Sequence, residues 1–415
     1  MKILFFLFLT LTIWKGRSQD LLLQNVRILD FGKGEFSEPT QLLIQNGKIK
    51  AIRPRIKPAH SVETLDLRGA YAIPGLIDAH VHLSNDPKES RADRIRHLEY
   101  FLQHGITTIR DAAGDARILK DLQNRVRTGE IAGPDIHYAA FIAGPPYYKD
   151  NDREKNMVAG LDTIFAPWLQ CIQPGADLQQ AMKAAKNCGA TGIKIYGGLT
   201  REELFPLVKA AKAERLKIWG HAALFPAKPK DVADAGIEVI SHAYLLEWEN
   251  VSETLSEDFF KNYELFYSQI DHQHINSLPF ITAVKKQGAI FDPTLYLCMV
   301  NNMEWSADVV KKAYQAGVKI CAGTDYINDL SRAYPFLFDE ITLYVNQCGF
   351  TPLDAIRSAT LIAAEALGIE KETGSLTLGK QADLLILNDN PLRNIENLKS
   401  IDLIIKHGKK QIIVK

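Results

Sequence analysis

The sequence feature that most constrains the fold is an alternation of short apolar segments with longer amphipathic ones. The short segments are rich in branched residues, as buried strands are, and the longer ones have helical spacing. Eight strand segments are expected, at 73–83, 107–113, 135–143, 192–198, 217–223, 237–244, 288–295 and 318–325. Eight repeats of strand and helix predict a (β/α)8 TIM barrel of the α/β class. A doubly wound open sheet is the alternative, although we find no Gly-x-Gly-x-x-Gly turn to support it.

The two ends of the chain have a different pattern. Residues 19–72 and 375–415 alternate apolar and polar positions over short stretches, with turns expected at Asn46-Gly47 and Gly408. Each end alone would leave sheet edges open, so we expect the two to pair into one small β-sandwich domain. The barrel then occupies residues 73–374, with long insertions after its third and sixth strands at 144–175 and 245–287.

The first residues predict a leader. Met1-Lys2 is followed by an apolar run at 3–14 and by a small-residue exit at Gly16 and Ser18. This order is typical of a secretory signal peptide, so we expect residues 1–18 to be cleaved and the protein to be exported, without stable insertion in a membrane. The run is short for a transmembrane helix, and an uncleaved anchor is the alternative. Equal numbers of basic and acidic residues, 49 of each, argue against a nucleic-acid partner.

Within the first strand segment, His80 and His82 are two residues apart. Side chains alternate faces along a strand, so these imidazoles point the same way, roughly 6 to 7 Å apart along the backbone. Two imidazoles side by side on a rigid strand end can hold one metal ion. A second pair, His272 and His274, stands in a polar region, and we expect it at the surface.

The active site of a barrel of this kind lies at the carboxyl ends of its strands. Metal-ligand types occupy several of those ends: His80, His82, Lys194, His221, His242 and Asp325. The first-strand phrase at 74–83, together with GIKIYGG, GHAA, SHAY and AGTD, resembles the amidohydrolase superfamily of metal-dependent hydrolases. Within that superfamily it looks most like the prolidase and Xaa-Pro dipeptidase-like group, which is related to imidazolonepropionase. The paired ends also resemble the composite β-sandwich of many amidohydrolases.

The resemblance implies a binuclear site with two divalent metal ions, most often zinc. His80, His82 and Asp325 would hold one ion, His221 and His242 the other, and a carboxylated Lys194 would bridge them. A hydroxide between the ions would attack the substrate, while Asp325 accepts its proton and passes it to the leaving nitrogen. The reaction implied is hydrolysis of a C–N bond in a peptide, an N-acyl amino acid or a cyclic amide.

Other functions remain possible interpretations of the sequence. A mononuclear deaminase or imidazolonepropionase-like hydrolase would lack the bridging lysine and often carry a Glu soon after the fifth-strand histidine, whereas His221 is followed by Ala-Ala-Leu-Phe-Pro. A lactonase or phosphotriesterase would use the same attacking group, and a non-catalytic binding module would have lost ligands. Tyr196 and Tyr244 lie two residues beyond candidate ligands on the same face, so both are candidates for substrate binding. A small-molecule substrate is expected, and a homo-oligomer is left open.

Overall fold

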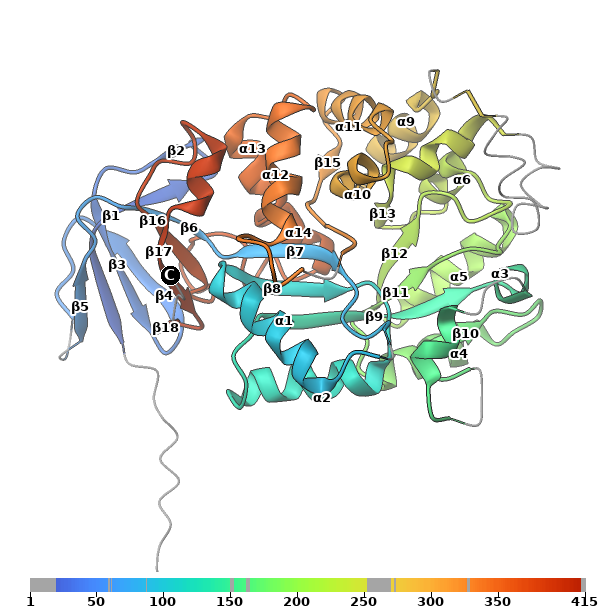
Figure 1. Ribbon diagram of the computed structural model, residues 1–415, viewed down its shortest axis with the longest axis horizontal. Helices are drawn as coiled ribbons and strands as arrows, with labels where there is room; N and C mark the ends of the chain where they lie inside the picture. The colour runs from blue at the N-terminus through green and yellow to red at the C-terminus, as the bar shows by residue number, and fades with distance from the viewer. Residues whose placement is uncertain are drawn as a thin grey trace, which may run out of the picture.

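The structure is a computed structural model that describes residues 20–58, 60, 62–86, 88–149, 153–161, 165–251, 270–271, 274–326 and 329–411. The predicted signal peptide and His272 lie outside the described residues. Two sheets organise the chain, and helices surround one of them (Figure 1).

The larger part of the molecule is built on a parallel sheet whose neighbouring strands follow chain order. Its strands are β7 (Leu76–Val81), β8 (Ile106–Asp111), β9 (Asp135–Ala143), β11 (Gly192–Ile195), β12 (Lys217–His221), β13 (Val239–Ser241), β14 (Ile290–Asp292) and β15 (Lys319–Ile320), with β10 (Leu169–Cys171) beside β9. Each of the eight expected segments therefore contains a strand, and most of these strands are shorter than expected.

The last strand region returns to the first one. The backbone N–H of Ala79 donates to the carbonyl of Ala322 at 3.0 Å, and that of Asp325 donates to the carbonyl of His80 at 2.8 Å. These bonds join the segment after β15 to β7, so the sheet curls round on itself. The result is the barrel-like α/β fold that the repeats predict.

Helices connect the strands and pack outside the sheet (Figure 1). They are α1 (Arg91–Gln103), α2 (Ala116–Thr128), α3 (Pro145–Lys149), α4 (Leu178–Asn187), α5 (Arg201–Ala213), α6 (Pro229–Asp234), α9 (Leu278–Gln287), α10 (Leu295–Val300), α11 (Trp305–Gln315), α12 (Phe336–Asn346), α13 (Pro352–Ser358) and α14 (Leu361–Leu367), with 3-10 turns η1 (Arg153–Val158), η2 (Ala243–Asn250) and η3 (Ile395–Lys399). Among the residues that the structure describes, none of these helices combines the length and apolar character needed to span a membrane.

Helix α2 shows how the local sequence sets such an element. The side chain of Asp115 accepts a hydrogen bond from the N–H of Arg117 at the start, and Gly129 ends the helix in the left-handed conformation. Leu119 and Leu122 are buried on its inner face. The cap, the apolar stripe and the terminal glycine agree, so the helix has the extent that its sequence predicts.

The two ends of the chain meet in the second sheet, whose path runs β18-β17-β16-β6-β1-β3-β4. Its strands are β1 (Leu21–Asp30), β2 (Glu35–Phe36), β3 (Thr40–Gln45), β4 (Lys48–Arg53), β5 (Glu63–Asp66), β6 (Tyr71–Pro74), β16 (Leu384–Leu387), β17 (Ile401–Lys406) and β18 (Lys409–Lys410). Strand β6 pairs with β1 on one side and with β16 on the other. Figure 1 shows this meeting of blue and dark red strands. A sandwich of two stacked sheets stays a prediction.

The expected strand at 73–83 is two strands, divided at Gly75. A Cβ atom at Gly75 would lie 2.3 Å from Oγ1 of Thr107, so no side chain fits there. The N–H of Gly75 donates to the carbonyl of Asp383 at 2.9 Å, which ties this joint to the terminal sheet. Strand β6 thus crosses the expected boundary between residues 72 and 73, and the barrel strand begins at Leu76.

Candidate functional site

The candidate metal ligands stand at the carboxyl ends of five barrel strands. His80 lies in β7, Lys194 in β11, and His221 is the last residue of β12. His82 and His242 lie just beyond β7 and β13, and Asp325 lies five residues after Ile320, the end of β15. Because parallel strands end at the same rim, these side chains converge.

Asp325 is the centre of the first group. Its Oδ1 lies 3.1 Å from Nε2 of His80 and 2.9 Å from Nε2 of His82, and its Oδ2 lies 3.7 Å from Nδ1 of His242. Nε2 of His80 is buried and lacks a partner in hydrogen-bonding geometry despite that short distance. One ligand atom each from His80, His242 and Asp325 falls within 4.8 Å of the others, a spacing that suits a metal ion, although the amidohydrolase resemblance assigns His242 to the second ion rather than the first.

The remaining candidates adjoin this group. The rings of His221 and His242 are 4.6 Å apart between centroids. Lys194 is fully buried, and its Nζ donates to Oγ of Ser241, the residue before His242, at 2.5 Å. All six predicted residues therefore lie in one connected cluster, and their roles as metal ligands stay a prediction.

Burial sets the protonation of the nitrogen ligands. It lowers the pKa of His221 and of His242 well below the usual value, so both imidazoles are neutral near pH 7. Burial, helped by the charge of Arg110, lowers the pKa of Lys194 to about 7, so much of this amine is unprotonated near neutral pH. Neutral nitrogen is the form that metals bind.

The carboxylate of Asp325 carries the negative charge that a cation site needs. Burial raises the pKa of Asp325, but its interactions with His80, His242 and His82 outweigh burial and hold that pKa well below the usual value. An ionised carboxylate beside imidazole nitrogens is a suitable donor set for divalent cations such as zinc. The residues present therefore fit the metal that the amidohydrolase resemblance implies.

The residues that hold these candidate ligands in place were not among those predicted from the sequence. Oδ2 of Asp292 accepts hydrogen bonds from Nδ1 of His80 at 2.7 Å, from Oγ of Ser241 at 2.9 Å and from Nη2 of Arg110 at 3.2 Å. A carboxylate can only accept, so Nδ1 of His80 carries the proton and Nε2 is left for a metal. Asp292 ends β14, the seventh strand, so reading every strand end for polar residues would have found it.

Two further contacts orient the other imidazoles. Oγ1 of Thr294 lies 3.1 Å from Nδ1 of His242, and Nδ2 of Asn85 lies 2.9 Å from Nδ1 of His82. Such contacts fix the rotation of a ligand ring, which sequence spacing alone does not reveal.

The two tyrosines differ in what they can offer a substrate. The hydroxyl of Tyr196 donates to the carbonyl of Ala112 at 2.8 Å, and its ring stacks on Phe141 with centroids 3.9 Å apart. The ring of Tyr244 lies 5.3 Å from that of His242. Both lie beside the cluster, while the hydroxyl of Tyr196 is already bound, and their substrate-binding role stays a prediction.

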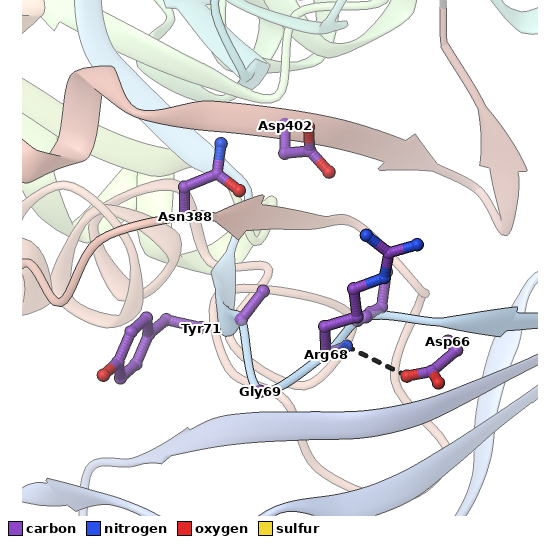
Figure 2. Close-up of a pocket in the computed structure, with 8 residues that line it drawn as sticks. Asp66, Arg68, Gly69, Tyr71, Asn388 and Asp402 are labelled. Carbon is purple, nitrogen blue, oxygen red and sulfur yellow. Dashed lines mark hydrogen bonds between the residues drawn. The ribbon is translucent and has the colours of Figure 1, made fainter.

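A surface cavity of about 500 Å³ lies elsewhere, on the terminal sheet. Figure 2 shows its lining by Asp66, Arg68, Tyr71, Asn388 and Asp402, with the N–H of Arg68 donating to Asp66. It shares no lining residue with the histidine cluster, so its position does not identify the catalytic centre.

Several known proteins are similar to this chain in sequence. Ochratoxinase from Aspergillus niger is 26% identical over 379 residues, covering 81% of this chain and 75% of that protein. Imidazolonepropionase from Symbiobacterium thermophilum is 35% identical over 102 residues, covering 24% of this chain and 23% of that protein.

Solved structures share the fold. A Xaa-Pro dipeptidase with bound methionine superimposes with a TM-score of 0.73 at 22% identity, covering 94% of this chain and 99% of that one. The structure of A. niger ochratoxinase gives a TM-score of 0.71 at 18% identity, covering 94% and 95%. A sequence model of the Amidohydrolase family matches residues 71–410, a range that contains all six candidate ligands. This chain therefore belongs to the amidohydrolase family.

Proposed function

We propose that this protein is an exported, binuclear zinc amidohydrolase that hydrolyses a C–N bond in a peptide, an N-acyl amino acid or a cyclic amide. The observation that carries the proposal is the convergence of six ligand-type side chains at the ends of five strands, with Lys194 buried among them. Family membership supports hydrolysis of C–N bonds in small molecules. Prolidase or Xaa-Pro dipeptidase activity is the finer proposal, because likeness at 22% identity extends to the fold alone.

The ligands divide between two ions in this proposal. His80, His82 and Asp325 would hold the first, and His221 and His242 would hold the second. Lys194 would contribute to both as a carbamate, which forms when its unprotonated amine bonds to the carbon of carbon dioxide and releases a proton. The low pKa of Lys194, about 7, supplies that amine near neutral pH.

Bound metal ions would lower the pKa of a water molecule and polarise the scissile carbonyl group. Asp325 is ionised, so its carboxylate accepts a proton during attack and delivers it to the leaving nitrogen. The hydrogen bond from His80 to Asp292 keeps the imidazole in its ligating tautomer.

The second candidate is a mononuclear deaminase or imidazolonepropionase-like enzyme, which the similarity to imidazolonepropionase favours. The buried Lys194 argues against it, and so does the Ala222-Ala223 sequence that follows His221. Esters are a further substrate class, since the attacking group suits a lactonase or phosphotriesterase as well.

Metal analysis and a substrate panel test the proposal together. Protein produced with zinc and bicarbonate should contain about two metal ions per chain. The loaded enzyme is then assayed on Xaa-Pro dipeptides, N-acyl amino acids including ochratoxin, cyclic amides and lactones. A content of one ion at most refutes the binuclear centre, and turnover of lactones alone refutes the C–N assignment. The Asp325→Asn variant is the control for contaminating activity.

Export is tested separately. The mature protein should begin near Gln19, as judged by N-terminal sequencing of material from the native host. Protein that still starts at Met1 contradicts cleavage.

A further inference from the structure

Glu340 of helix α12 is a buried carboxyl group that the proposed chemistry does not use. Its side chain is fully buried, and among the described residues no ion pair joins it to a basic side chain. Three donors meet it instead: the N–H of Leu295 at 2.9 Å, the N–H of Tyr296 at 2.5 Å and the hydroxyl of Tyr344 at 2.7 Å.

A carboxyl group in this environment is a poor source of stability. Burying it without a countercharge is unfavourable, and an apolar side chain of similar volume often packs as well or better. Burial raises the pKa of Glu340 to about 8, although all three donors favour the charged form. Stability therefore does not explain why a carboxyl group lies here, and the groups that are hydrogen-bonded to Glu340 suggest another role.

Two of the three donors, the N–H groups of Leu295 and Tyr296, lie at the start of helix α10, immediately after Thr294. Thr294 has a φ of +48° and a ψ of +51°, the left-handed conformation that a β-branched residue rarely adopts. The two N–H groups bound to Glu340 belong to the next two residues, so Glu340 fixes the chain where Thr294 makes its unfavourable turn.

Three contacts join residues 292–294 to His242 and to the residue after it. The N–H of His242 donates to the carbonyl of Asp292 at 2.9 Å, and the N–H of Ala243 donates to that of Pro293 at 3.0 Å. Oγ1 of Thr294 contacts Nδ1 of the imidazole at 3.1 Å. The rotation of the His242 ring thus depends on where Thr294 lies.

We infer that Glu340 is a positioning residue that acts through Thr294 to orient His242, and so sets the affinity of the second metal position. This inference rests on the proposed function, in which His221 and His242 hold that ion. Glu340 contacts neither ligand, so its effect passes through the backbone of residues 294–296. Loss of a group that orients a metal ligand commonly weakens binding by about 10- to 100-fold.

Cobalt titration of metal-free protein tests the inference, because visible absorption reports the two positions directly and independently of turnover. Wild type should bind two Co²⁺ ions. Glu340→Met, which keeps the volume but removes both acceptors, should weaken the second event by about 10- to 100-fold and leave the first unchanged. Glu340→Gln, which keeps one acceptor oxygen, should fall between them.

A double variant tests whether Glu340 acts on His242 through Thr294. Thr294→Val should weaken the same event, and the double variant should be no weaker than the worse single one, because both substitutions break one chain of contacts. Glu203→Met is the matched control: Glu203 accepts the N–H of Thr200 at 2.8 Å at the start of α5, just after the strand that bears Lys194. It should change the melting temperature without changing cobalt affinity.

The outcomes separate the two claims. A wild type that binds one Co²⁺ ion overturns the binuclear proposal itself. Two ions in wild type with an unchanged second affinity in folded Glu340→Met overturns only the positioning role. If Glu340→Met does not fold, Glu340→Gln and Thr294→Val decide, and wild-type affinity in either one overturns the route through Thr294.

Discussion

Replacement of Asp292 by Ala would remove two roles of this carboxylate, as the charge partner of Arg110 and as the hydrogen-bond acceptor for His80. Asp292 is fully buried, and its Oδ2 receives His80, Ser241 and the equally buried Arg110. The substitution therefore removes a charge partner from a buried guanidinium and an acceptor from a candidate metal ligand at the same time.

The structure sets the size of both effects. Breaking a buried ion pair by removing one partner typically costs about 3–5 kcal/mol of unfolding free energy, because the remaining charge is left unpaired. Among the described residues, Arg110 then keeps only the carbonyl of Ala79 and the face of Trp219, whose centroid is 4.8 Å from the guanidinium carbon, so we expect a cost in that range. His80 loses the acceptor that fixes its tautomer, which should lower affinity for the first metal by about 10- to 100-fold.

Chemical denaturation of metal-free protein measures the first effect, and titration with Co²⁺ or Zn²⁺ measures the second. The double variant Arg110→Met/Asp292→Leu is the control, because it removes both charges and retains apolar volume. It should regain most of the stability but none of the metal affinity. A loss below about 1 kcal/mol in Asp292→Ala, or a double variant that regains metal affinity, would refute this reasoning.

Three further outcomes follow, two from the candidate site and one from the contact between His407, which follows β17, and Asp135 of β9. Lys194→Ala should lose the second metal and most activity, and acetate or propionate should partly restore both; full metal content with normal turnover would contradict a bridging role. Asp325→Asn should lower kcat/KM by about 10²- to 10⁴-fold in excess metal, with little change in melting temperature, since Asn cannot accept the proton. Activity within about threefold of wild type would assign that proton transfer to another group. His407 lies 2.9 Å from Asp135, whose hydrogen bond raises the pKa of His407 above its unfolded value, so this contribution to stability is full below about pH 6.5 and is lost as pH rises through the folded pKa. His407→Gln should therefore lower the urea midpoint more at pH 5.5 than at pH 9, and equal losses would contradict the linkage.

The candidate ligand set was accessible to sequence reasoning because it follows one rule, a metal-binding residue at the end of an apolar strand. Asp292 ends β14, but it lies inside the expected strand segment 288–295 rather than at its end, so the rule did not single it out. Thr294 and Glu340 obey no such rule. Glu340 is 46 residues from Thr294 in sequence, and only the packing of α12 beside α10 brings it to the backbone of Leu295.

The fold, like the candidate site, was predicted from the sequence only in part. Alternating polarity predicted the strands at both ends and the turn at Asn46-Gly47, which connects β3 and β4. It did not reveal the break at Gly75, because an apolar run reads as continuous whether one sheet or two sheets bury it. The clash with Thr107 that requires glycine there is a tertiary contact.

The position of β6 between β1 and β16 has a consequence for synthesis. Residue 74 ends β6 and residue 384 begins β16, so 310 residues must be added before the second partner of β6 exists. At about 5–20 residues per second, that interval is roughly 15–60 s. Throughout it, the edge of β6 that β16 will cover lacks this partner, and such an edge readily pairs with other chains. Strands β16 and β17, at residues 384–406, therefore close the first sheet to be made, and a nascent chain stalled before them would be prone to aggregate rather than merely shortened.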